Sequence, residues 1–148
     1  MTRILRTDAI QVAVIPVRRS AGGSLQVCLI RRRGSGKWGI PKGFIDPGFS
    51  HARAALAEAD EEAGLDGRVV GGAIGTYEYE KRSRSLTVAV YVMEVHVERA
   101  TWLEMRWRKR RWYSLKEAGA RLKGHHVSAL YERVRSKLYT MLADALRR

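Results

Sequence analysis

Three glutamates within five residues are the side chains of this sequence best placed to do chemistry. Glu58, Glu61 and Glu62 stand at positions i, i+3 and i+4 of one segment. In a helix, at about 100° per residue, that spacing gathers the three carboxylates within an arc of about 100°. Such like charges repel one another, and a divalent cation among them reverses the repulsion. Carboxylate oxygens are ligands that Mg²⁺ prefers, so the cluster indicates either a solvated acidic face or a metal site for phosphate chemistry.

The segment that carries these glutamates is predicted to be a helix over His51–Ala63. Its apolar stripe has helical spacing and consists of Ala52, Ala55, Leu56, Ala59 and Ala63. Ser50 is suited to cap the start of this helix, and Gly64 to end it. The preceding residues 38–50 form a loop rich in glycine and proline, which can bring backbone groups close to a metal or a phosphate.

The remaining elements must position this helix. The patterns predict strands over 9–18, 25–32, 68–81 and 85–97, and helices over 114–122 and 126–146. Because residues 86–97 are apolar in both directions, their strand is expected to be covered on both faces. The order therefore predicts an α/β fold with one mixed β-sheet between helices. A length of 148 residues fits a single domain over residues 1–148.

Residues 43–65 join the glycine loop to the acidic helix in one spaced motif. Six positions of that motif are Gly43, Glu58, Glu61, Glu62, Gly64 and Leu65. In them the segment resembles the Nudix box of the Nudix hydrolases, which reads Gly, five residues, Glu, seven residues, then Arg-Glu-apolar-any-Glu-Glu-any-Gly-apolar. Phe49 stands where the box has its first Glu, and Ala57 where it has Arg. The chain thus keeps six of the eight fixed positions.

Two flanking segments resemble one branch of that family. Residues 38–43 are similar to the Trp-x-x-Pro-Lys-Gly stretch of the diphosphoinositol polyphosphate and diadenosine polyphosphate hydrolases, and residues 110–118 to their later Arg-x-Trp-aromatic stretch. The resemblance implies an α/β/α sandwich around a mixed β-sheet. It also implies a pyrophosphohydrolase that cleaves a phosphoanhydride in a nucleoside or dinucleoside polyphosphate, or in a diphosphoinositol polyphosphate.

The resemblance also assigns roles to residues. Glu58, Glu61 and Glu62 are expected to bind Mg²⁺, with Mn²⁺ as an alternative, and one of them to act as the base. The backbone carbonyl of Lys42 is expected to add a metal contact. Phe49 and Ala57 replace the Glu and the Arg of the box together, which removes two charges that compensate each other. This paired loss favours a variant of the site in which both changes are tolerated. The alternative is a catalytically weak Nudix domain that binds nucleic acid or a nucleotide as a sensor.

The net charge points to an anionic partner. Lys and Arg number 28 against 15 Asp and Glu, which gives +13. The basic clusters are either a solvated face or a cationic rim for a phosphorylated small molecule. The residues expected to contact substrate are Arg31, Arg32, Lys42, Gly43 and Arg82. Because arginines interleave with Trp107 and Trp112, nucleic acid is a second possible partner.

The remaining features favour a cytoplasmic protein without a membrane segment. The chain has one cysteine, Cys28, lacks an apolar run of about 18 residues, and has no apolar core in its N-terminal residues. Outside the box, Glu78, Glu80 and Glu104 are the carboxylates placed to add a metal contact or a base. His125, His126 and Trp38 are expected to have capping, surface or packing roles.

Overall fold

The computed structural model describes residues 10–146 of the 148-residue chain. The N-terminal residues 1–8 and Ala9, the first residue of the first predicted strand, lie outside the described residues, as do residues 147–148. Across the described range, no helix combines the length and the apolar character needed to cross a membrane.

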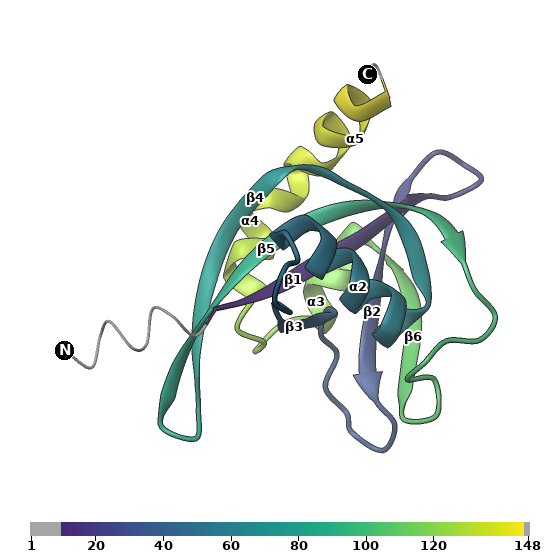
Figure 1. The fold of residues 1–148 in the computed structure, drawn as a ribbon. Coiled ribbons are helices and arrows are strands. Elements are labelled where there is room, and N and C mark those ends of the chain that lie inside the picture. The colour runs from purple at the N-terminus through teal and green to yellow at the C-terminus, as the bar shows by residue number, and fades with distance from the viewer. Residues whose placement is uncertain (1–9, 147–148) are drawn as a thin grey trace.

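A six-stranded mixed sheet runs through the described part of the chain (Figure 1). Its strands are β1 (Ile10–Arg19), β2 (Leu25–Arg32), β3 (Lys42–Phe44), β4 (Leu65–Lys81), β5 (Arg84–Glu98) and β6 (Arg108–Ser114). The strand order is β4-β5-β1-β2-β6, and the short β3 pairs with the first half of β1. β1 and β5 are parallel, whereas the other paired strands are antiparallel. The sheet is therefore mixed, as the sequence predicts.

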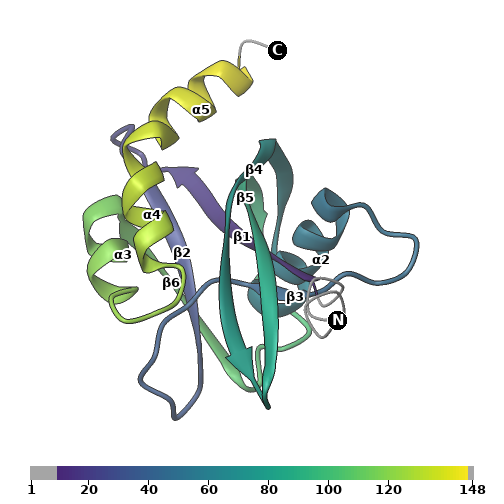
Figure 2. The same ribbon diagram turned by 90° about the vertical axis from the view of Figure 1, so that its left-hand side faces the viewer.

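Helices cover both faces of this sheet (Figure 2). On one face, α2 (His51–Ala63) packs its alanines against Val12 and Val14 of β1. The opposite face packs against α3 (Leu115–Arg121), α4 (Ser128–Val134) and α5 (Leu138–Leu146). Successive residues of a strand point to opposite faces, so a strand apolar in both directions, such as β1, needs cover on both sides. The predicted α/β/α sandwich is confirmed.

One predicted element was wrong, and two strands were not predicted. The single helix predicted over 126–146 is two helices, α4 and α5, joined by a short 3₁₀ turn at Arg135–Lys137. Side chains four residues apart advance about 40° around a straight helix, so a straight helix would turn Leu130 and Leu142 to different faces. Both are buried in one core, which the change of direction permits. The strands β3 and β6 were not predicted, because neither shows apolar alternation.

Candidate active site

Helix α2 presents the three glutamates from its second half. The Ser50 hydroxyl caps the helix by accepting a hydrogen bond from Arg53 N–H at 3.2 Å. At the other end Gly64 adopts the left-handed conformation, with φ of 67°, and its N–H donates to the Asp60 carbonyl at 3.0 Å. Both predicted caps are thus present, and they fix where the helix begins and ends.

The helix meets the glycine loop through Glu58. The space that a side chain at Gly43 would occupy is filled by the Glu58 carboxylate, so a larger residue here would displace that carboxylate. Gly43 is itself held in β3, where it pairs with Val12 of β1. The carboxylate therefore lies directly against a strand backbone that the sheet keeps in place.

Glu58 and Glu62 form a carboxylate pair. Glu62 is only 5% exposed, although it carries an ionisable group. Burial raises the pKa of Glu62 well above its usual range, and a hydrogen bond with Glu58 raises this pKa further. At Glu61 burial raises the pKa, helped by the charges of Glu58 and Glu104. The arrangement thus concentrates negative charge that a cation would relieve.

An arginine from the sheet edge reaches this pair. Arg108 on β6 places Nη2 3.6 Å from Glu62 Oε1 and lowers the pKa of that carboxyl, opposing the effect of burial. The same guanidinium donates from Nε to Glu104 Oε1 at 2.6 Å. Glu104, one of the carboxylates expected outside the box, therefore lies beside the glutamates. The sequence placed Arg108 only among the basic residues, and nothing in its spacing indicated Glu62 as its partner.

The C-terminal turn of α2 is held by residues far along the chain. Three of its carbonyl oxygens accept hydrogen bonds. The Glu61 carbonyl accepts from Glu104 N–H at 3.0 Å, the Glu62 carbonyl from Trp102 Nε1 at 3.0 Å, and the Ala63 carbonyl from Arg110 Nη1 at 2.7 Å. Arg110 also lies over the Trp102 ring at 4.0 Å. A cation at a helix C-terminus is favourable, because the last carbonyls carry partial negative charge. Residues 102–110 therefore hold in place the turn that carries Glu61 and Glu62.

The two positions that depart from the box are packed together with apolar groups. Phe49 is half-buried against the core beneath α2, and the Arg53 guanidinium lies over its ring at 4.7 Å. Phe49 and Ala57 line the same shallow surface pocket.

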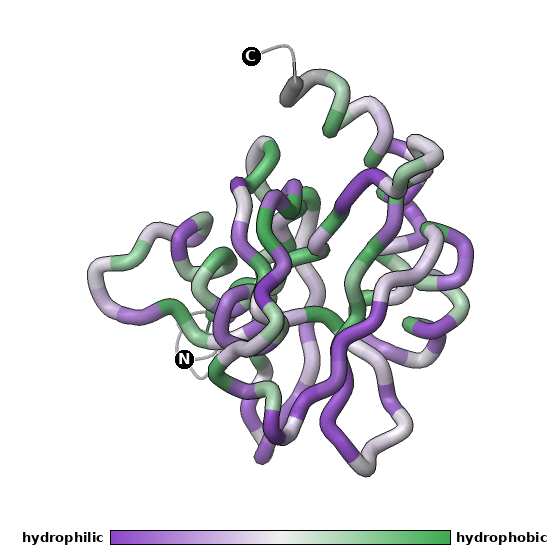
Figure 3. The backbone as a smooth tube through the Cα atoms, turned by 90° about the vertical axis from the view of Figure 1, so that its right-hand side faces the viewer, coloured by the Kyte–Doolittle hydropathy of each residue, from purple (hydrophilic) through white to green (hydrophobic). Residues whose placement is uncertain are grey.

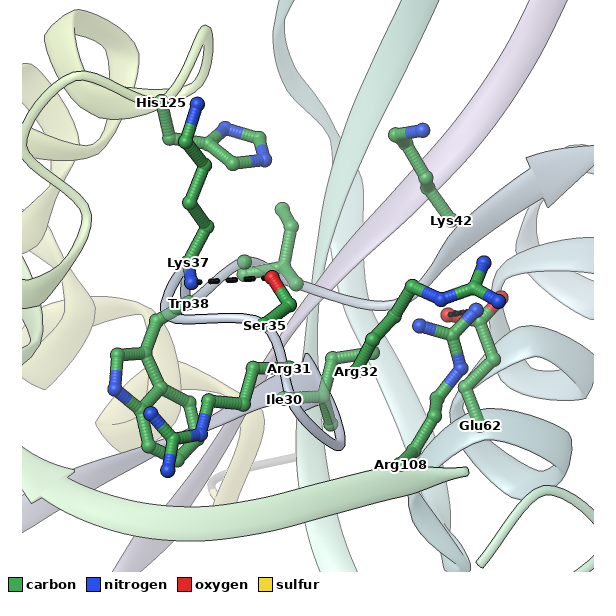
Figure 4. Close-up of a pocket in the computed structure, with 12 residues that line it drawn as sticks. Ile30, Arg31, Arg32, Ser35, Lys37, Trp38, Lys42, Glu62, Arg108 and His125 are labelled. Carbon is green, nitrogen blue, oxygen red and sulfur yellow. Dashed lines mark hydrogen bonds and ion pairs between the residues drawn. The ribbon is translucent and has the colours of Figure 1, made fainter. Parts of the chain in front are cut away.

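An open cavity of about 270 Å³, here named the glutamate pocket, adjoins Glu62 (Figure 4). It is lined by Ile30, Arg31, Arg32, Ser35, Lys37, Trp38, Gly39, Ile40, Lys42, Glu62, Arg108 and His125. Of the predicted substrate-binding residues, Arg31, Arg32 and Lys42 therefore meet at one cavity. Arg82 lies in the β4–β5 turn and does not line this cavity. Gly43 does not line it either, and lies against the Glu58 carboxylate.

Opposite Glu62, the glutamate pocket has an aromatic wall. Burial, together with the charges of His126 and Lys42, lowers the pKa of His125 to about 4, so the ring is neutral at pH 7. His125 Nδ1 accepts from Val127 N–H at 3.0 Å, which leaves Nε2 as the donor. Trp38 is 8% exposed and packs edge-on against Tyr113, and the Arg31 guanidinium lies over it at 4.8 Å.

The donor set fits a Mg²⁺ ion that is shared with a substrate. Within residues 10–146, no three His, Cys, Asp or Glu side chains are grouped closely enough to hold a metal ion by themselves. Mg²⁺ commonly takes one or two carboxylates and fills its other positions with water and phosphate oxygens. Glu58 and Glu62 supply such a pair, and the close approach of Glu58 to the Gly43 backbone brings it next to Lys42.

Comparison with known proteins gives a family and a fold. The NUDIX domain family model matches residues 8–133. The chain is 31% identical over 112 residues to Nudix hydrolase 21, chloroplastic, of Arabidopsis thaliana, covering 72% of this chain and 56% of that protein. To Nudix hydrolase 16, mitochondrial, of the same plant it is 31% identical over 106 residues, covering 66% and 58%. The chain spans little more than half the length of these relatives.

Solved structures share the fold. An Ap4A hydrolase binary complex from C. elegans superposes with a TM-score of 0.73 at 19% identity, covering 89% of this chain and 98% of that one. A MutT protein from Methanosarcina mazei Go1 superposes with a TM-score of 0.61 at 21% identity, covering 86% and 94%. The family model, the relatives and the acidic helix against Gly43 agree, and the chain belongs to the Nudix family.

Proposed function

We propose that this protein is a Mg²⁺-dependent pyrophosphohydrolase that cleaves a phosphoanhydride in a phosphate-rich small molecule. One observation carries the proposal: the buried Glu62, paired with Glu58, lines a pocket whose other charged residues are all cationic, namely Arg31, Arg32, Lys37, Lys42 and Arg108. Carboxylates that suit a cation, next to cations that suit phosphates, are what hydrolysis of a pyrophosphate requires. The substrate class is a nucleoside or dinucleoside polyphosphate, or a diphosphoinositol polyphosphate.

The reaction assigns a task to each group. Bound Mg²⁺, or Mn²⁺ in its place, would neutralise phosphate oxygens and lower the pKa of an attacking water. Glu58 and Glu62 would hold the ion with the Lys42 carbonyl, and Glu61 or one of that pair would accept the proton of the water. Arg32 and the Lys42 ammonium would hold the phosphates in line. The water oxygen would bond to the attacked phosphorus as the bond from that phosphorus to the bridging oxygen breaks, and the bridging oxygen would leave with the other phosphate.

Similar proteins support this assignment. The relatives in Arabidopsis thaliana are named hydrolases, and one structure that shares the fold is described as an Ap4A hydrolase. We extend the proposal to one domain over residues 1–148, since the family model covers residues 8–133. We extend the proposal to a reducing, cytoplasmic setting, because the single cysteine, Cys28, is buried and forms no disulfide.

The test is a panel of pyrophosphates incubated with the purified protein. Diadenosine polyphosphates, nucleoside triphosphates, a nucleotide sugar and a diphosphoinositol polyphosphate are each supplied with Mg²⁺ or with EDTA, and the released nucleotide or phosphate is measured. We expect turnover in the samples with Mg²⁺ and none in those with EDTA, and the highest rates for the most phosphorylated compounds. If no compound is cleaved while a nucleotide or RNA binds tightly, the protein is a sensor and the proposal fails.

A further inference from the structure

A second cavity adjoins the glutamate pocket on its aromatic side. This distal cavity, of about 220 Å³, is lined by Gly36, Lys37, Trp38, Arg121, Lys123, Gly124 and His125. It shares Lys37, Trp38 and His125 with the glutamate pocket. Figure 4 shows Lys37, Trp38 and His125 on one side of that pocket and Glu62 with Arg108 on the other. The distal cavity therefore begins at the end of the pocket away from the carboxylates.

The lining of the distal cavity is cationic. Lys37, Arg121 and Lys123 contribute three positive charges, and no acidic residue lines it. The nearby Glu117 pairs with Arg121 at 3.3 Å, but both side chains are about half exposed, and such a pair one helical turn apart is weak. Arg121 also lies over the Tyr113 ring at 5.2 Å, which orients the guanidinium without neutralising it. The remaining charge suits an anionic group.

The wall between the two cavities is rigid. Trp38 is nearly fully buried and packs against Tyr113, and Gly39 bonds through its N–H to the Ile30 carbonyl at 2.7 Å and accepts from Ile30 N–H at 2.9 Å. On the other side, His125 N–H donates to the Leu122 carbonyl at 2.8 Å. A molecule that reaches from Glu62 past this wall would thus find its far end beside Arg121 and Lys123.

We propose that the distal cavity is an anion subsite that holds the phosphate groups of a substrate lying farthest from the cleaved anhydride. This inference rests on the proposed function for the identity of the substrate, but not for the binding of an anion. The ligand class is a compound with several phosphates spread along a chain or around a ring. Arg121 and Lys123 would then favour such compounds over those with a single pyrophosphate, through binding and not through the chemical step.

The test combines binding without turnover and kinetics. Inositol hexakisphosphate has no anhydride to cleave, so its binding is measured by calorimetry in EDTA. Arg121→Gln with Lys123→Gln is compared with Lys116→Gln and Arg133→Gln, exposed residues of α3 and α4 outside both cavity linings that remove the same two charges. We expect the first pair to weaken binding by about tenfold or more, and the second by less than about twofold, because charge-assisted hydrogen bonds are lost only in the first.

Kinetics separate the subsite from the function. In the same variants, kcat/KM should fall more for diadenosine tetraphosphate than for diadenosine diphosphate, through KM with kcat nearly unchanged. If the double variant folds poorly, the single variant Lys123→Gln, a change at an exposed residue, replaces it, and its kcat/KM should change in the same direction.

Equal weakening of binding by both pairs of substitutions, or no weakening by either, would overturn the subsite whatever the turnover. Selective loss of binding in a protein that cleaves nothing would keep the subsite and reject the proposed function. Tighter binding of a short RNA than of the inositol phosphate, lost in the same variant, would also overturn it.

Discussion

At the scale of single residues, the raised pKa of Glu62 makes a prediction about stability. A carboxyl whose pKa is raised by folding contributes full stability below its unfolded pKa of about 4.3, and that contribution is lost as the pH rises toward the folded value. The metal-free protein should therefore lose stability from pH 5 upward, and Glu62→Gln should remove much of that slope. Urea unfolding in EDTA at several pH values measures this. A variant that is less stable than the wild type at pH 8 would contradict the account of a buried, repelled carboxylate.

The two broken box positions give a second prediction at this scale. Phe49 packs against the core beneath α2 and under Arg53, so a carboxylate there would lose apolar burial. We expect Phe49→Glu combined with Ala57→Arg to leave the rate unchanged or to lower it. Steady-state kinetics of the double variant decide this. A rate increase of tenfold or more, about 1.4 kcal/mol of barrier, would mean that the departures weaken the site.

At the scale of elements, the segment before β6 should control the last turn of α2. Trp102→Phe keeps an aromatic ring but removes the hydrogen bond to the Glu62 carbonyl, at a cost of about 1 kcal/mol. We expect faster hydrogen exchange at the end of α2 and a higher Mg²⁺ requirement. Trp107→Phe is the matched control, since Trp107 is 47% exposed. Equal effects of both changes would mean that the bond to α2 does not position the glutamates.

The sequence reveals elements where local signals agree and misses them where distant contacts decide. Helix α2 was predicted with both of its ends, because the alanine stripe, Ser50 and Gly64 all act within one segment. β6 was not predicted because residues 108–111 are all basic, and only pairing with β2 makes them a strand. In the same way, spacing along one helix indicated the glutamates, whereas Trp102 and Arg110 contact α2 across 40 and 47 residues. Such contacts come from the loop before β6 and from β6 itself, neither of which carries a periodic signal.

At the scale of the whole molecule, the charge of +13 should draw anionic substrates to the protein. Figure 3 shows the backbone from the right-hand side of Figure 1, with hydrophilic stretches along it. We expect kcat/KM to fall with rising salt, and more steeply for substrates with more phosphates, because the Debye length shrinks from about 10 Å at 0.1 M to about 3 Å at 1 M. Kinetics across this salt range measure the effect.

A pair of variants separates pocket charge from net charge. Arg32→Ala, at the glutamate pocket, should lower kcat/KM increasingly with phosphate count, whereas Arg19→Ala, exposed at the end of β1, removes the same charge elsewhere. Matching losses for the two variants would show that only the overall charge matters. Losses independent of phosphate count would argue against a cationic rim.

The role proposed for Glu58 and Glu62 is to hold a metal ion for hydrolysis of an anhydride. The most direct test of this role is the rate of diadenosine tetraphosphate cleavage as a function of Mg²⁺ concentration, for the wild type and for Glu62→Gln. We expect the variant to need far more Mg²⁺ and to lose orders of magnitude in kcat, because an amide poorly replaces a carboxylate at a hard cation. A variant with the rate and the Mg²⁺ dependence of the wild type would contradict it.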